Sequence, residues 1–116
     1  FGWCGDMDIV KRPIMGCIAG KYSEVVDITS GKPRTEFPDE IISEIAAGVQ
    51  DISKRNINLL YKTVSDRCCA IQYALSIAHN QDIVLIAGKG HEDYQILKDK
   101  TVHFDDREEV RKALRG

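Results

Sequence analysis

Three short stretches carry the side chains that could do chemistry, and the turn SGKPRTE (30–36) is the first of them. It places Lys32 and Arg34 on either side of a proline. The planar fork of an arginine matches a carboxylate, with which it forms paired hydrogen bonds. A solvated surface turn would have much the same composition. The stretch therefore predicts either a carboxylate-binding turn or a plain surface turn.

The second stretch is AGKGHEDYQ (87–95). Glycines flank Lys89, and His91, Glu92 and Asp93 follow in a row. Glycine allows a backbone to approach a ligand closely. The stretch is not a Walker A loop, which needs G-x-x-x-x-G-K-[ST] at the start of a helix. Its density of titratable groups favours a substrate loop over a charged turn.

The third stretch, GDMDIVKRP (5–13), combines two acids, two cations and a glycine just before an expected helix. The backbone amides at a helix start suit an anion. Asp6 or Asp8 could equally well act as the N-cap of that helix. Both interpretations stay open from the residues alone.

The remaining reactive side chains form no recognisable catalytic or metal site. Neither Ser-His-Asp nor Cys-His groupings can be argued; His79 is expected at a helix end, and His103 on the surface or an edge strand. The four cysteines lack the C-x-x-C pairs typical of zinc sites, so we expect no metal. They are expected to be free thiols in a reducing compartment, with Cys17 and Cys69 acting as small core residues.

Strands and helices must alternate along the chain to position these stretches. Apolar residues at helical spacing predict helices at 11–22, at 38–48 with Gly48 marking the end, and at 66–79. Asp105 or Asp106 is expected to cap a fourth helix that runs to about Leu114. Short β-branched or apolar runs predict strands at 24–29, 57–62 and 82–88, the end of a strand within 1–10, and a hairpin at 94–97 and 101–103. The run 82–88 is continuous and apolar, which is typical of a strand buried on both faces.

This alternation predicts an α/β fold with a mainly parallel sheet. Ligands of such sheets gather outside the carboxyl ends of the strands. The loops that leave those ends are 4–12, 30–37 and 88–93, and they coincide with the three stretches above. We therefore expect one site that the three loops share.

Composition limits the alternatives. A chain of 116 residues with 43% hydrophobic residues suits one domain, here 1–116. A net charge of −2 and a pI near 5.9 argue against a nucleic-acid partner. The apolar runs are too short to span a bilayer, and the start at Phe1 suggests a piece of a longer protein.

Five motifs in order resemble the C-terminal domain of the Mur ligases: FGWCGDMDIVKRPIMG, TSGKPRTEFP, SDRCCAI, VLIAGKGHEDYQ and FDDRE. The resemblance covers nearly the whole chain, and GKGHEDYQ is especially characteristic. It implies a Rossmann-like three-layer sandwich. Members of this family are cytoplasmic enzymes of peptidoglycan synthesis with three domains, of which the first holds a UDP-sugar and the second holds ATP.

The resemblance implies an ATP-dependent ligase that adds a diamino acid, meso-diaminopimelate, to UDP-MurNAc-L-Ala-D-Glu. ATP and Mg²⁺ would be bound mainly by the central domain, which this chain lacks together with the N-terminal domain. We therefore expect no catalytic residue in this chain and no ligase activity from it alone. The partners would be the two substrates and the protein's own other domains.

Only some of the residues that form the family's amino-acid pocket are present at the matching positions of this sequence. Arg34, Gly88 and Glu92 match its motifs; Glu92 would hold the distal ammonium and Arg34 the distal carboxylate. Met7 stands where G-D-R-D has its arginine, and Lys32 stands where D-N-P-R has its asparagine. Either Lys32 replaces the lost arginine, or the pocket has degenerated and the chain is a non-catalytic interaction domain.

Overall fold

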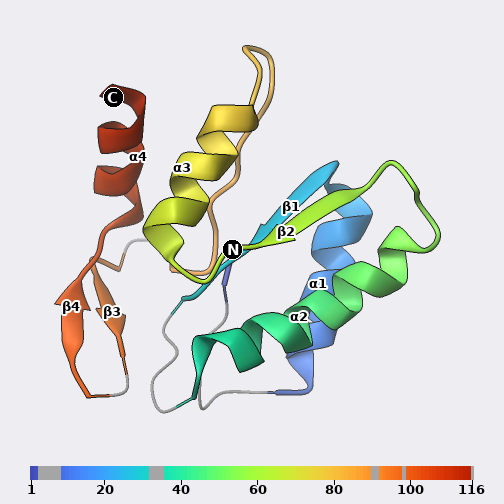
Figure 1. The fold of residues 1–116 in the computed structure, drawn as a ribbon, viewed down its shortest axis with the longest axis horizontal. Helices are drawn as coiled ribbons and strands as arrows, with labels where there is room; N and C mark the ends of the chain where they lie inside the picture. The colour runs from blue at the N-terminus through green and yellow to red at the C-terminus, as the bar shows by residue number, and fades with distance from the viewer. Residues whose placement is uncertain (3–8, 32–35, 90–91, 98, 116) are drawn as a thin grey trace.

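The computed structural model of the protein describes residues 1–2, 9–31, 36–89, 92–97 and 99–115. Helices and strands follow one another in the order α1 (Lys11–Tyr22), β1 (Val25–Ile28), α2 (Pro38–Ser53), β2 (Leu60–Thr63), α3 (Arg67–Ile77), β3 (Tyr94–Ile96), β4 (Thr101–His103) and α4 (Asp106–Arg115). Figure 1 shows α1 and α2 side by side on one side of the β1–β2 pair, with α3 and α4 together on the other. The expected helices and the expected hairpin are thus confirmed, with shifted ends.

Strands β1 and β2 form a parallel pair, with Val25 opposite Leu60 and Ile28 opposite Thr63. Phe1 lies along the other edge of β1. Its nitrogen donates to the Asp27 carbonyl at 2.7 Å, and its carbonyl accepts from the Thr29 N–H at 2.8 Å. These two bonds flank Ile28 in the manner of a parallel ladder. The start of the chain therefore continues the sheet beyond β1.

The core lies between this parallel pair and the inner face of α2. Its fully buried members are aliphatic and come from β1, α2 and the residue before β2: Val26, Ile28, Ile41, Ile42, Ile45, Ala46, Val49 and Leu59. Those from α2 recur every three to four residues, which is the spacing expected for one helical face. Burial of this face holds α2 against the strands. It thereby fixes the position of Pro38, where α2 begins.

Gly48 does not end α2, as the sequence suggested, but lies in its interior. A side chain at Gly48 would collide with the carbonyl of Pro13 in α1, and one at Gly16 would collide with the carbonyl of Ile45 in α2. The missing side chains let the two helices approach closely. Gly48 is therefore a packing residue, and α2 continues to Ser53.

Aspartates cap the two helices on the other side. Asp66 accepts a hydrogen bond from the Cys68 N–H at 2.9 Å, and Asp105 accepts one from the Arg107 N–H at 2.8 Å. Capping of the last helix by Asp105 agrees with the expectation. Among the described residues, no helix is long and apolar enough to cross a membrane.

The segment 82–88 differs most from its prediction. Within it the structure assigns no strand, and Ile83 and Leu85 are 95% and 83% exposed. Val84 and Ile86 between them are half-buried, so the burial alternates with a period of two. The segment is covered on one face only, which corrects the expectation of a strand buried on both.

Three smaller expectations also change or hold. Strand β2 begins at Leu60 rather than at 57, because the Asn56 side chain accepts from the Asn58 N–H and closes a turn there. Cys69 is exposed, not a core residue, because its neighbours Ala70 and Ile71 hold the buried face of α3. His103 lies exposed on β4, as expected.

The glycine contact between α1 and α2 predicts a specific sensitivity. Gly48→Ala would force the two helices apart, so we expect a loss of about 1–3 kcal/mol in the free energy of unfolding. Urea unfolding measures this. Ser43→Ala, at an exposed position of the same helix, serves as the control and is expected to change stability by less than about 0.5 kcal/mol. Equal midpoints for wild type and Gly48→Ala would contradict the close-packing role.

Candidate functional site

The five residues proposed for the site divide into two groups. Gly88 and Glu92 belong to the described residues, whereas Met7, Lys32 and Arg34 lie outside them. The chain on both sides of 32–35 is described, however, and so is most of the loop that carries Glu92. The contacts of these flanking residues define how the site is positioned.

Gly88 is in the left-handed region, with φ of +105°. A side chain there would come within 2.6 Å of the Gly2 carbonyl oxygen. The close approach expected of this glycine is therefore made to the backbone at the start of the chain. It also places the loop after 82–88 next to the end of β1, because Gly2 itself packs against Thr29 and Gly31.

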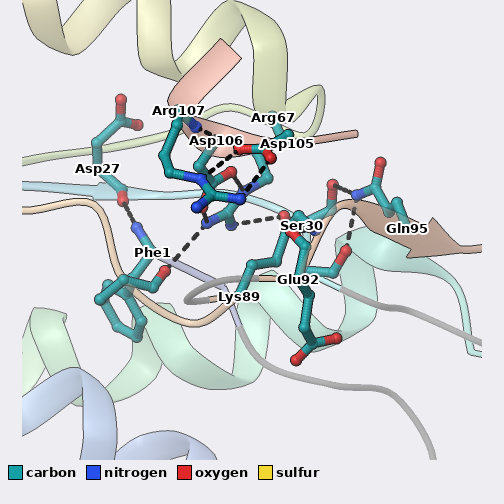
Figure 2. A network of polar contacts seen from close by, with 12 residues as sticks. Phe1, Asp27, Ser30, Arg67, Lys89, Glu92, Gln95, Asp105, Asp106 and Arg107 are labelled. Atoms are coloured by element: carbon teal, nitrogen blue, oxygen red, sulfur yellow. Dashed lines mark hydrogen bonds and ion pairs between the residues drawn. The ribbon is translucent and has the colours of Figure 1, made fainter. Parts of the chain in front are cut away.

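Lys89 points into the protein. It is 2% exposed, and its Nζ donates to the carbonyls of Glu92 at 3.1 Å and Tyr94 at 2.6 Å. The rings of Tyr94 and Phe104 lie within 6 Å of the ammonium, at 5.9 and 5.8 Å. The loop is thus folded around its own lysine. In Figure 2 the Glu92 carboxylate points away from this network.

Gln95 joins this loop to the turn that follows β1. It is 7% exposed, and its Nε2 donates to the Ser30 hydroxyl at 3.0 Å and to the Gly31 carbonyl at 2.7 Å. Gly31 immediately precedes Lys32. Figure 2 shows the amide of Gln95 reaching Ser30 across the gap between the two segments.

Arg67 connects the same region to both helices on that side. Its guanidinium forms two 2.7 Å bonds with the Asp106 carboxylate, and it also donates to the carbonyls of Ser30 at 3.0 Å and Ala87 at 3.1 Å. Arg67 is 1% exposed and Asp106 6%. The start of α4 is therefore partly buried.

Sequence reasoning missed Arg67 and Asp106 as positioning residues, although both lie in quoted motifs. A signal was present for Arg67: it opens α3, and a cation is unfavourable at the positive end of a helix dipole. Such a placement indicates a specific anionic partner. The neighbouring pair Arg107–Asp105 is more exposed; its hydrogen bonds hold the pKa of the Asp105 carboxyl well below its usual range.

Arg12 binds Glu36, the first described residue after 32–35, and it too was missed as a positioning residue. Its guanidinium is fully buried and binds both carboxylate oxygens of Glu36, at 2.7 and 2.9 Å, and Glu44 at 2.8 Å. The hydrogen bonds to Glu36 raise the pKa of Arg12 above its ordinary value. The two residues that flank 32–35 are therefore held by buried side chains, Gly31 by Gln95 and Glu36 by Arg12.

A groove of about 670 Å³ lies apart from these contacts, between α2 and β2. Asp39 and Ser65 in its wall are joined by a 2.9 Å hydrogen bond. Neither Gly88 nor Glu92, the two described candidate residues, lines this groove, so its size does not locate the site. The contacts of Gln95 and Arg67 instead bring the segment 92–95 and the residue before Gly88 next to Ser30 and Gly31, at the end of β1.

The two neighbouring ion pairs predict contrasting effects on stability. Asp106→Asn would leave the buried Arg67 guanidinium without its counter-charge, so we expect a loss of about 3–5 kcal/mol in the free energy of unfolding. Arg107→Ala removes the more exposed pair next to it and should shift the urea midpoint far less. Similar urea midpoints for the two variants would show that the Arg67–Asp106 pair contributes no more to stability than the exposed pair does.

Comparison with known proteins agrees with the resemblance noted from the motifs. Residues 1–90 match the family described as "Mur ligase, glutamate ligase domain". The chain is 49% identical over 98% of its length to the UDP-N-acetylmuramoyl-L-alanyl-D-glutamate–2,6-diaminopimelate ligase of Prochlorococcus marinus (strain NATL1A), covering 21% of that protein. It is 47% identical over 98% of its length to the enzyme of the same name from Caldanaerobacter subterraneus subsp. tengcongensis, covering 23%.

A solved structure of a UDP-N-acetylmuramoyl-L-alanyl-D-glutamate–2,6-diaminopimelate ligase has the same fold. The match has a TM-score of 0.87 and 38% identity, and it covers 99% of this chain and 23% of the other. The chain thus spans about a fifth of the length of the relatives it matches. With its α/β fold, parallel strands and four helices among the described residues, the chain belongs to the Mur ligase family.

Proposed function

We propose that residues 1–116 are the C-terminal, amino-acid-receiving domain of a UDP-N-acetylmuramoyl-L-alanyl-D-glutamate–2,6-diaminopimelate ligase. The observation that carries this proposal is 49% identity across 98% of the chain with a ligase of that name. The rest of the protein would comprise an N-terminal UDP-sugar domain and a central ATP domain. The enzyme would work in the cytoplasm, where its nucleotide substrates are made.

The reaction is amide formation driven by ATP. The γ-phosphoryl group passes to the terminal carboxylate of the UDP-linked dipeptide, and ADP leaves. The amine of the amino acid then attacks this acyl phosphate and releases phosphate. Because the chain has no G-x-x-x-x-G-K-[ST] loop, the phosphates and their Mg²⁺ are assigned mainly to the central domain. This chain contributes binding and orientation of the amino acid, which raises its effective concentration at the acyl phosphate.

The amino acid would lie between the two anchored loops. Glu92, on the loop held by Lys89, would accept hydrogen bonds from the distal ammonium, and Arg34 would donate to the distal carboxylate. Gly88 would keep the loop close to the end of β1. Support comes from the contact of Gln95 with Gly31, which joins the segment after Glu92 to the end of β1, and from the Glu92 carboxylate, which points away from the network around Lys89 in Figure 2.

Lys32 would supply the cation that Met7 does not. A side chain two residues before Arg34 can reach the same carboxylate, and a site with two cations favours a diacidic amino acid over lysine. The similarity to named ligases, together with the buried support beneath both loops, favours a working pocket over a non-catalytic interaction domain.

We further propose that the domain is a Rossmann-like three-layer sandwich. Phe1 extends the sheet beyond β1, and Gly88, at the end of 82–88, lies close to Gly2. Helices α1 and α2 would form one outer layer, and α3 and α4 the other, which agrees with the arrangement in Figure 1.

An assay of the full-length protein tests the proposal. With ATP, Mg²⁺, UDP-MurNAc-L-Ala-D-Glu and meso-diaminopimelate, we expect equal amounts of UDP-MurNAc-tripeptide, ADP and phosphate. Residues 1–116 alone should form no product. Full-length protein that forms no product with any diamino acid would overturn the proposal.

Arg34→Ala tests the assignment of the distal carboxylate. Loss of one charge-assisted hydrogen bond should lower kcat/KM for meso-diaminopimelate by about tenfold to a hundredfold. L-Lysine lacks that carboxylate, so its kcat/KM should stay nearly constant and the preference between the two should narrow. Arg115→Ala, at an exposed position at the end of α4, is the matched control. An equal loss for both amino acids would contradict the assignment.

A further inference from the structure

Gln95 occupies a position that neither the motifs nor the proposed reaction accounts for. Its side chain is buried in the middle of β3, only three residues after Glu92, yet its partners are Ser30 and Gly31, which follow β1. The sequence separation of these partners is 64 and 65 residues. A buried amide that spans two loops on this edge of the sheet is more than a local turn contact.

The chemistry of its partners fixes how the amide is oriented. A carbonyl oxygen can only accept a hydrogen bond, so the Gly31 oxygen at 2.7 Å must face the NH₂ group of Gln95 and not its oxygen. The same NH₂ group donates its second proton to the Ser30 hydroxyl. Both donors are therefore used, and a side chain that cannot donate would leave the Gly31 carbonyl facing it without a partner.

Further hydrogen bonds hold each end of this bridge. Ser30 is held from the other side by Arg67, which donates to its carbonyl at 3.0 Å. The chain before Gln95 is held by Lys89 through the carbonyls of Glu92 and Tyr94. Movement at Gln95 would therefore be transmitted to both loops and would not be absorbed locally.

We propose that Gln95 is a positioning residue that fixes the segment carrying Glu92 against Ser30 and Gly31 at the end of β1, and thereby the recognition of the amino acid. This inference rests on the proposed function. Gln95 touches no reacting atom, so its loss should act on amino-acid binding and leave the chemical step intact. The ligand concerned is an amino acid with a second ammonium and a second carboxylate, whose span the two loops must match.

Gln95→Glu in the full-length protein tests this. The substitution keeps the size and shape of the side chain but replaces the donors with a carboxylate facing the Gly31 carbonyl. We expect the KM for meso-diaminopimelate to rise about tenfold or more. The kcat at saturating amino acid should change less than about threefold, and the KM values for ATP and the UDP-linked dipeptide less than about twofold, because those substrates are bound elsewhere.

Two further variants keep the test decisive. Gln81→Glu makes the same charge change at an exposed glutamine and should match wild type. Ser30→Ala removes one of the two acceptors while leaving the Gly31 bond, so a smaller rise in the same KM is expected even if Gln95→Glu folds poorly. A loss of kcat with unchanged KM, or rises in all three KM values, would show a merely structural role and overturn the inference.

Failure of the proposed function is separable from failure of this inference. Wild-type protein that forms no product sinks the proposed function. Binding of meso-diaminopimelate to wild type and to Gln95→Glu is then compared by calorimetry. Tenfold weaker binding to the variant would still support the positioning role, whereas equal affinities, or no binding to wild type, would overturn it.

Discussion

The buried guanidinium of Arg67 is the interaction on which the rest of this region depends. A cation removed from water is tolerated only when it is paired and its donors are used. Arg67 meets this condition with the Asp106 carboxylate and with the carbonyls of Ser30 and Ala87. These partners lie at the start of α4, at the end of β1 and just before Gly88. One side chain thus fixes the relative positions of three segments that are distant in the sequence.

Polar contacts extend from Arg67 toward the candidate pocket. Ser30 accepts from Arg67 through its carbonyl and from Gln95 through its hydroxyl, and Lys89 holds the carbonyls on either side of Asp93. The apolar core lies elsewhere, under α2. The loops are therefore held by directional hydrogen bonds from buried side chains, which constrain position more narrowly than apolar packing does. Such rigidity suits a site that must match the span of a small zwitterion.

The sequence predicted the helices and the hairpin well because apolar periodicity reports which face of an element is buried. The prediction from sequence failed where contacts with a distant segment decide the structure. Gly48 was predicted to end a helix, but it lies inside α2 and packs against α1. The apolar run 82–88 was predicted to be buried on both faces, but Ile83 is exposed. Hydrophobicity alone does not show which face of a segment other elements will cover. Arg67 and Asp106 lie 39 residues apart, so no local pattern pairs them. Of the predicted site, Gly88 and Glu92 have described surroundings and Met7, Lys32 and Arg34 lie outside the described residues; the binding roles of all five remain predictions.

The central claim is that the loop carrying Glu92 and the turn after β1 together hold one diamino acid. A crystal structure of the full-length protein with meso-diaminopimelate tests it most directly. The claim predicts an ammonium of the ligand within hydrogen-bonding distance of Glu92, a carboxylate at the Lys32–Arg34 turn, and the Gln95 contacts to Ser30 and Gly31 intact. An amino acid bound away from either loop, or bound after the Gln95 contacts have opened, would contradict it.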